Sequence, residues 1–170
     1  ENIIIEPEAK NTAPCIGLAA VHIAKKNPES KMIVLPSDHL IKFNEIFLDT
    51  LKLGLEVVED DENIVTIGIT PNYPETGYGY INFKKGVSPH EITNVYEVLR
   101  FVEKPDLERA KQYLTSGEYL WNSGMFIWKV STILKCFEDF LPEIYTGLKE
   151  IEVAVNTEKY LETLKKVFSE

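Results

Sequence analysis

Asp38 is the first residue whose type and position could do chemistry. It follows a short apolar, β-branched run at residues 31–35, in the segment Leu35-Pro36-Ser37-Asp38-His39. If this run is a strand of a parallel sheet, Asp38 lies at the edge where such sheets bind ligands. A carboxylate there could hold one coordination position of Mg²⁺, with phosphate oxygens and water filling the rest. The alternative is an N-cap for the following helix, a role that Asp often takes. His39 has no paired ligand and is expected to be structural or exposed.

The loop at residues 6–14 offers side chains that could read a nucleotide base. A carboxylate accepts two hydrogen bonds, and guanine presents two adjacent donors, so Glu6 suits guanine and suits uracil or thymine poorly. Asn11 and Thr12 could contact the base or the ribose. Their alternative role is to cap the helix that follows.

Glu103 and Lys104, two adjacent residues of opposite charge, end a strand-like segment that stops at Pro105. Because neighbouring residues of a strand point to opposite faces, the two side chains need not neutralise each other. Glu103 could accept hydrogen bonds from sugar hydroxyls, and Lys104, a compact cation with three donors, could bind a phosphate. The alternative is a solvated strand end.

Two further segments could recognise a sugar. Asn122, in Trp121-Asn122-Ser123-Gly124-Met125-Phe126, offers an amide to hydroxyl groups, although this segment also fits a glycine-containing bulge in an aromatic core strand. Gly79, in Thr76-Gly77-Tyr78-Gly79-Tyr80, offers flexible backbone with exposed amides, or simply turns the chain. The second segment lacks the glycine spacing of dinucleotide folds and of P-loops.

Alternating strands and helices must position these residues. Apolar and aromatic runs predict strands at 2–5, 31–35, 64–69, 80–84, 95–102 (with a bulge near Val98-Leu99) and 120–128. Helical periodicity predicts helices at 13–24, 43–58 and 106–114, the last capped by Asp106 and stopped at Ser116-Gly117. A helical tail follows, with Ser131 and Thr157 as expected caps. The fold class is therefore α/β, with a doubly wound, mostly parallel but mixed sheet.

Composition and charge narrow the class of protein. The chain has 170 residues and a formal net charge of −9, with 44% hydrophobic and 26% charged residues, as expected for one folded domain with a sizeable core. The negative charge disfavours nucleic acid and anionic membranes as partners. No apolar run is long enough to span a membrane and no signal peptide is recognisable, so a cytoplasmic location is expected. Cys15 and Cys136 are expected to be reduced thiols.

Five segments together resemble the sugar-1-phosphate nucleotidyltransferases, and most closely the mannose-1-phosphate guanylyltransferases. In chain order they are Glu6-Pro7-x-x-Lys10-Asn11-Thr12-Ala13-Pro14, Leu35-Pro36-Ser37-Asp38-His39, Pro74-Glu75-Thr76-Gly77-Tyr78-Gly79-Tyr80-Ile81, Phe101-Val102-Glu103-Lys104-Pro105 and Trp121-Asn122-Ser123-Gly124-Met125-Phe126. The last two point only to the superfamily, whereas the first three in combination narrow the resemblance to the mannose enzymes. The resemblance extends to about Trp128 and implies a nucleotide-diphospho-sugar transferase-like fold.

The resemblance implies a reaction and a role for each candidate residue. The phosphate oxygen of mannose 1-phosphate would attack the α-phosphorus of GTP, giving GDP-mannose and pyrophosphate, with Mg²⁺ as cofactor. Asp38 would bind the metal and Lys104 the sugar phosphate, and both would be catalytic. Glu6, Asn11 and Thr12 would lie near guanine, and Gly79, Glu103 and Asn122 would hold mannose. Such a transfer needs in-line positioning and charge neutralisation rather than a covalent nucleophile.

The sequence also departs from this family. The family's opening Gly-rich loop with a basic residue, and its second metal-binding aspartate, have no counterpart in the 170 residues. We therefore expect a partial, N-terminally truncated catalytic domain with little or no transferase activity of its own. Its nucleotide side would span about 1–70, its sugar side about 71–130 and its helical tail 131–170. The alternative is a catalytically silent domain that binds nucleotide sugars to regulate a partner. The sequence leaves open whether the protein forms a homo-oligomer.

Overall fold

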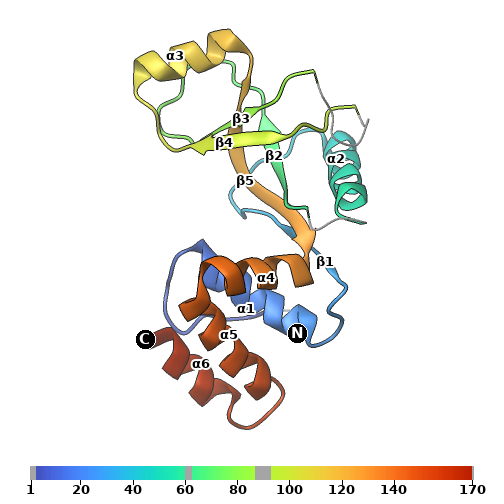
Figure 1. Ribbon diagram of the computed structural model, residues 1–170, viewed down its shortest axis with the longest axis vertical. Coiled ribbons are helices and arrows are strands. Elements are labelled where there is room, and N and C mark those ends of the chain that lie inside the picture. Colours follow the sequence, from blue (N-terminus) through green and yellow to red (C-terminus); the bar gives the residue numbers. More distant parts are fainter. Residues whose placement is uncertain (1–2, 60–62, 87–92, 170) are drawn as a thin grey trace. The chain divides into compact units, whose positions relative to one another are not determined.

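The computed structural model describes residues 3–59, 63–86 and 93–169 (Figure 1). The elements are α1 Thr12–Ala24, β1 Lys31–Val34, α2 Asn44–Val57, β2 Val65–Ile69, β3 Tyr80–Phe83, β4 Val98–Val102, α3 Leu107–Ser116, β5 Tyr119–Lys129, α4 Val130–Phe140, α5 Pro142–Ala154 and α6 Tyr160–Ser169. The strands form one sheet in the order β1-β5-β3-β4, and β2 also pairs with β5. The α/β class predicted from the sequence is confirmed.

Two compact units divide the chain. The helical unit comprises Glu1–Val34, Lys42–Ile64 and Ile127–Glu170, and the β unit comprises Leu35–Ile41 and Val65–Phe126. The long strand β5 gives its first residues to the β unit and its last three to the helical unit. The candidate residues therefore fall into two groups, one in each unit.

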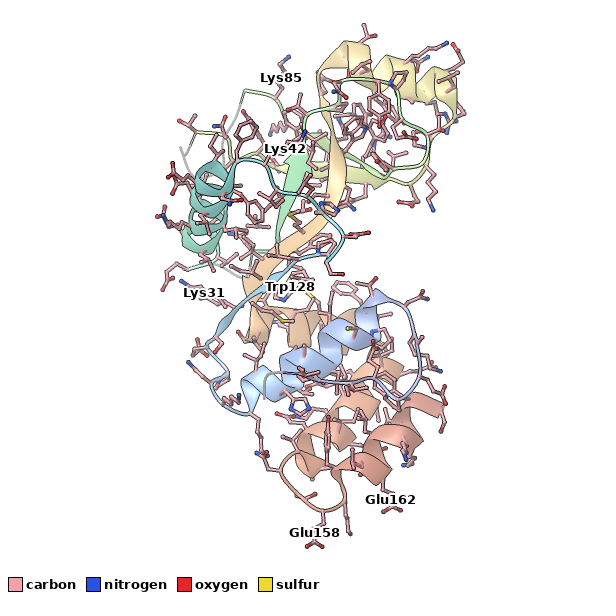
Figure 2. All side chains as sticks on the ribbon, turned by 180° about the vertical axis from the view of Figure 1, so that it is seen from behind. Lys31, Lys42, Lys85, Trp128, Glu158 and Glu162 are labelled. Atoms are coloured by element: carbon pink, nitrogen blue, oxygen red, sulfur yellow. The ribbon has the colours of Figure 1, made fainter. Side chains whose placement is uncertain are left out.

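The helical unit buries one face each of α1, α4, α5 and α6. Its core consists of Leu18, Val21, Phe137, Leu148, Ile151, Val155, Leu164 and Phe168. Gly17 lets α1 approach α5 closely, since a Cβ there would lie only 2.6 Å from Cδ1 of Leu148. Glu158 and Glu162 project outward beside the start of α6 (Figure 2), where negative charge stabilises the positive end of the helix dipole.

A polar contact joins α1 to α6 in the helical unit. Nε2 of His22 lies 2.8 Å from the Tyr160 hydroxyl, and the two rings meet edge to face. Burial, and then the nearby charge of Lys26, lower the pKa of His22. The partial burial of His22 therefore favours the neutral form of its ring.

In the β unit, β3 lies between β4 and β5 and is antiparallel to both. Tyr80 is opposite Val102 on one side and Trp121 on the other. Asn82 pairs with Arg100 but Phe83 pairs with Val98, so the intervening Leu99 is the extra residue of a bulge. This confirms the bulge predicted near Val98-Leu99.

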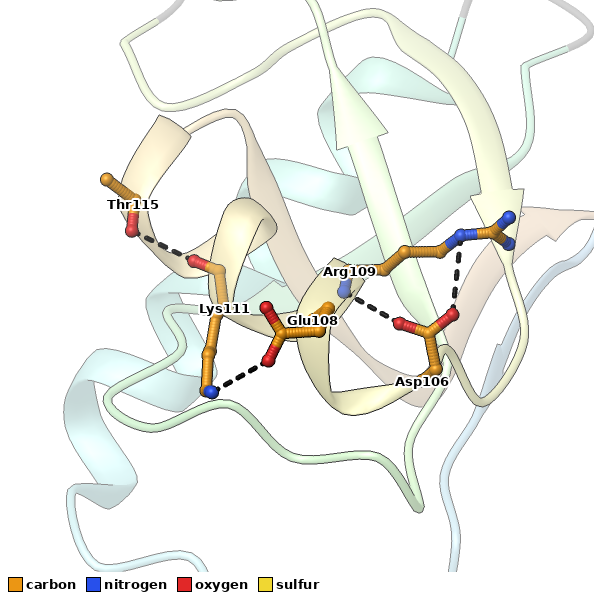
Figure 3. Close-up of polar contacts among 5 residues, drawn as sticks. All are labelled: Asp106, Glu108, Arg109, Lys111 and Thr115. Carbon is orange, nitrogen blue, oxygen red and sulfur yellow. Dashed lines mark hydrogen bonds and ion pairs between the residues drawn. The ribbon is translucent and has the colours of Figure 1, made fainter.

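Helix α3 covers one face of these three strands. Tyr80, Tyr119 and Trp121 of the sheet pack with Ala110 of α3 in a common apolar cluster. The Asp106 carboxylate accepts a hydrogen bond from the Arg109 backbone N–H at 2.8 Å (Figure 3), which satisfies a free donor of the first turn. Gly117 ends the helix in the left-handed conformation, at φ 65°. Both predicted boundaries of this helix are confirmed.

Two sequence predictions are wrong. The strand expected at 2–5 is absent from residues 3–5, where Ile3 and Ile5 are each 75% exposed, while Asn2 lies outside the described residues. Apolar side chains alone do not make a strand, because its backbone groups need a pairing partner. The expected cap Ser131 lies inside α4, because this helix begins directly after β5 with Lys129 at the N-cap position.

The remaining predicted elements are observed with shifts of a few residues at their ends. Thr157 accepts a hydrogen bond from the backbone N–H of Lys159, in the turn before α6. Within the described residues, neither Cys15 nor Cys136 is part of a disulfide. Within the described part of the chain, no helix has both the length and the apolar character needed to cross a membrane.

Candidate functional site

Gly79, Glu103 and Asn122 come together on one face of the β unit. Gly79 directly precedes β3, Glu103 directly follows β4, and Asn122 belongs to β5. The backbone N–H of Asn122 donates to the carbonyl of Gly79 at 2.8 Å. A Cβ on Gly79 would lie 2.8 Å from Oε2 of Glu103 and 3.5 Å from Cβ of Asn122. The missing side chain of Gly79 thus lets the carboxylate of Glu103 and the side chain of Asn122 lie close to its backbone, and we call these three residues the polar triad.

The amide group of Asn122 has a defined orientation. Its Oδ1 accepts a hydrogen bond from the backbone N–H of Gly124 at 3.0 Å. Gly124 has φ 71°, a conformation that favours glycine. The neighbouring Ser123 is buried, donates to the carbonyl of Ile67 at 2.6 Å and accepts from the N–H of Met125. These bonds fix the strand, so the Nδ2 group of Asn122 can act as a donor toward Gly79.

Lys104 adjoins the polar triad and has an unusual backbone. Its φ is 42°, in the left-handed region that non-glycine residues seldom adopt. Its N–H donates to the carbonyl of Tyr78 at 3.2 Å, and its Nζ lies 3.6 Å from Oε1 of Glu103. Both side chains are largely exposed, so this ion pair contributes little to stability. The left-handed backbone at Lys104 therefore places its ammonium group beside the Glu103 carboxylate, and not on the opposite face as in a regular strand.

The glycine-rich loop before β3 is held in place by aromatic and backbone contacts. Tyr73 and Tyr78 both contact Trp121 edge to face, and their ring centroids lie 4.9 Å and 5.5 Å, respectively, from that of Trp121. The Glu75 carboxylate accepts from the N–H groups of Thr76 and Gly77, and its carbonyl accepts from the Tyr80 hydroxyl at 2.7 Å. The glycines of this segment did not predict these contacts from the sequence. The signal that could have indicated them is the presence of Tyr73, Tyr78 and Tyr80 beside the glycines.

Asp38 lies in the loop that follows β1. This loop, at Leu35–Ile41, belongs to the β unit. It is not a helix cap, because α2 begins at Asn44 with Phe43 at its N-cap. Its carboxylate is 86% exposed and lies 4.0 Å from Nε2 of His39. Pro36, in the same loop, lies 3.5 Å from the position that a Cβ on Gly124 would take. The loop that carries Asp38 thus contacts the segment that carries Asn122.

The donor set around Asp38 limits the kind of metal that it can bind. Among the described residues, no group of three His, Cys, Asp or Glu side chains is arranged to hold a metal ion. One exposed carboxylate fits Mg²⁺ that takes its remaining ligands from phosphate oxygens and water. It does not fit an ion held by protein ligands alone.

Glu6, Asn11 and Thr12 lie in the helical unit, before and at the start of α1. Asn11 occupies the N-cap position, but its side chain makes no cap hydrogen bond. Oε1 of Glu6 is buried and has no partner among the described residues, and an unmet buried acceptor is costly. The pKa of the Cys15 thiol is raised by its partial removal from water, then by the charge of Glu6 and by its hydrogen bond to Glu6. Glu6 thus interacts with Cys15, while its Oε1 lacks a hydrogen-bond donor among the described residues.

The sequence matches the family described as nucleotidyl transferase over residues 1–163. It is 46% identical to a mannose-1-phosphate guanylyltransferase of Klebsiella pneumoniae over 156 residues, which cover 91% of this chain and 32% of that protein. The chain thus spans about a third of the length of such curated relatives.

Solved structures resemble the chain as well. A crystal structure described as mannose-1-phosphate geranyltransferase from Thermus thermophilus matches with a TM-score of 0.83 and 29% identity, over 98% of this chain and 45% of that one. The crystal structure of mannose-6-phosphate isomerase from Helicobacter pylori matches with a TM-score of 0.72 and 32% identity, over 88% of this chain and 54% of that one.

Proposed function

Because the chain belongs to the nucleotidyl transferase family, we propose that it serves the transfer of GMP from GTP to mannose 1-phosphate, which yields GDP-mannose and pyrophosphate. The observation that carries this proposal is the polar triad, since it brings an exposed carboxylate and an oriented amide together beside a glycine backbone. The similarity to proteins named mannose-1-phosphate guanylyltransferase supports the choice of nucleotide and sugar.

The β unit would bind the sugar phosphate. A pyranose ring would lie against the polar triad, with hydroxyl groups donating to Glu103 and accepting from Asn122. Lys104 lies next to Glu103, so its ammonium group would meet the phosphate attached to that ring. The binding of a phosphate would also draw Lys104 away from Glu103 and leave the carboxylate free for the hydroxyls.

The nucleotide would be recognised by the other group of residues. The unmet acceptor of Glu6 suits the N1–H and amine donors of guanine, and Asn11 and Thr12 would contact the base or ribose. Asp38 would hold Mg²⁺ together with phosphate oxygens. That ion would neutralise the developing charge on the phosphates, which matters in a chain of formal charge −9.

Calorimetric titration of GDP-mannose and of GDP into the chain tests the sugar-binding role. Glu103→Gln should weaken binding of GDP-mannose about tenfold, as expected for the loss of a hydrogen bond to a charged group, and should leave binding of GDP unchanged. Glu97→Gln is the matched control, because Glu97 is also an exposed glutamate of the β unit paired with a lysine. Equal effects of the two variants would contradict the proposal.

The same titrations with and without Mg²⁺ test the role of Asp38. Mg²⁺ should strengthen binding of the diphosphate to the native chain and should have no effect on Asp38→Ala. If metal dependence survives that substitution, Asp38 is not the ligand. We further propose that this polypeptide binds GDP-mannose without synthesising it, so an assay of pyrophosphate release from GTP and mannose 1-phosphate should give no signal above background.

A further inference from the structure

Both arginines of the chain line one pocket of the β unit. Arg100 and Arg109 are the only arginines among the 170 residues, whose other cationic side chains are lysines and histidines. The pocket has a volume of about 530 Å³ and lies between β4, α3 and the start of β5. Gln112, Tyr113 and Tyr119 are among its other lining residues. The pocket is widely open to solvent, and its volume lies within the range of small-molecule sites.

The guanidinium group of Arg100 is fixed beside an aromatic surface. Its Nη2 donates to the Tyr119 hydroxyl at 2.7 Å. The ring of Tyr119 stacks on that of Tyr113, with centroids 3.9 Å apart and planes 14° from parallel. The hydrogen bond uses one of the five N–H donors of Arg100. The remaining donors and the paired rings therefore line the same space.

Arg109 reaches the pocket from the first turn of α3. Its Nε lies 3.5 Å from Oδ2 of Asp106, and its two terminal nitrogens point away from that carboxylate (Figure 3). Glu108, the other acidic residue of this turn, pairs with Lys111 at 2.8 Å and does not line the pocket. Two guanidinium groups thus face one cavity in a chain that carries an excess of negative charge.

The pocket lies on the opposite face of the strands from the polar triad. Trp121, which packs with Ala110 of α3, and Asn122 of the polar triad are consecutive residues within β5, and consecutive residues of an extended strand point to opposite faces. Tyr80 and Trp121, the neighbours of Gly79 and Asn122, pack under α3 on the pocket side. A ligand in this pocket would therefore not occupy the face of the polar triad.

We propose that this pocket is a second ligand site, which binds a small phosphorylated molecule with an aromatic or other planar group. Guanidinium groups bind phosphate through paired hydrogen bonds, and the half-buried ring of Tyr113, stacked on the buried Tyr119, offers a surface for a planar ring. Gln112 adds an amide that can donate to phosphate or read the ring. This site is independent of the polar triad and of the function proposed for it.

The probe is adenosine 5′-monophosphate, because it joins a phosphate to a planar base and lacks the donor pair that Glu6 would read in guanine. Its binding to the 170-residue chain is followed by chemical-shift changes of backbone amides. Saturable shifts at Gln112, Tyr113 and Tyr119 are expected, and adenosine without phosphate should bind at least about tenfold more weakly.

Arg109→Gln is the main variant, because Arg109 is exposed and its side chain has no role in the apolar core. It should weaken binding of the monophosphate about tenfold, and Arg100→Gln should do the same. Lys111→Gln is the matched control, since it removes a positive charge two residues further along α3 without touching the pocket. Glu103→Gln should also leave this binding unchanged.

Three results at the pocket itself would overturn the proposal. They are the absence of saturable shifts at these residues, equal binding of adenosine and its monophosphate, and equal losses in Arg109→Gln and Lys111→Gln. A loss in Glu103→Gln alone would move the phosphate to the polar triad and would also overturn it. Failure of the second site leaves the titrations with GDP-mannose unaffected, so the two proposals are tested separately.

Discussion

The two faces of the β3-β4-β5 strands differ in what their side chains do. On one face, Glu103 lies close to Gly79 and its side chain is largely exposed. On the other face, Tyr80 and Trp121 are buried under α3. Because side chains alternate along a strand, two consecutive residues can serve binding and stability separately. Substitutions on the face of Glu103 should therefore change the affinity for a ligand, whereas those on the face of Tyr80 should change the free energy of unfolding.

The largest expected effect is that of Tyr80→Ala on stability. Tyr80 is fully buried, and its hydroxyl donates to the carbonyl of Glu75 at 2.7 Å. Removal of a large buried aromatic side chain costs about 3–5 kcal/mol through lost apolar burial and the resulting cavity. Urea unfolding of the variant should show a loss of this size. Tyr80→Phe keeps the ring and should lose only about 1 kcal/mol, the worth of one hydrogen bond.

Glu103→Gln, on the opposite face of the strands, is the substitution to compare with Tyr80→Ala in stability. Its carboxylate is exposed and its ion pair with Lys104 is solvated, so the free energy of unfolding should change by less than about 0.5 kcal/mol. A loss in Glu103→Gln comparable to that in Tyr80→Ala would show that the two faces do not divide stability and binding in this way.

Gly79→Val tests the binding face by adding a side chain to it. The new side chain would start 2.8 Å from Oε2 of Glu103, so the exposed carboxylate must move from the place where it would meet a sugar. We expect the affinity for GDP-mannose to fall at least about tenfold, with a smaller change in the free energy of unfolding than in Tyr80→Ala. Titration calorimetry and urea unfolding measure the two quantities.

Gly77→Val is the matched control for this substitution. A Cβ on Gly77 would also lie near an exposed glutamate oxygen, at 3.2 Å from Oε1 of Glu75. Gly77 belongs to the loop before β3 and not to the polar triad, so its substitution should leave the sugar contribution to affinity intact. A loss of affinity in Gly77→Val as large as that in Gly79→Val would assign the effect to the loop instead.

Elements with local signals could be predicted from the sequence. Asp106 and Gly117 mark the ends of α3 through cap and left-handed geometry, and periodic apolar residues mark α1 and α2. The segment at 3–5 has a strand-like composition but no observed strand, because pairing depends on a partner that composition does not specify. Local chemistry is readable in a sequence, whereas pairing is a property of the whole fold.

For the candidate site, too, the residue types could be predicted from the sequence but their arrangement could not. The residue types of Gly79, Glu103 and Asn122 suggested sugar recognition, but only the antiparallel register brings them beside one another. The pocket of the two arginines had no sequence motif, because Arg100 and Arg109 reach it from different elements. The scarcity of arginine in the chain was the one signal available in advance.

Lys104→Gly has a small expected effect on stability. It is informative because stability and binding should change in opposite directions at this one residue. The left-handed φ of 42° costs a lysine about 1 kcal/mol relative to glycine, and the larger entropy of glycine in the unfolded chain offsets part of this gain. Urea unfolding should therefore show a net stabilisation of about 0.5 kcal/mol. The affinity for GDP-mannose should nevertheless fall, because the ammonium group is lost. Lys104→Asn, which tolerates the same backbone conformation without the charge, should lose affinity equally. If both variants bind as tightly as the native chain, the left-handed lysine does not serve phosphate binding.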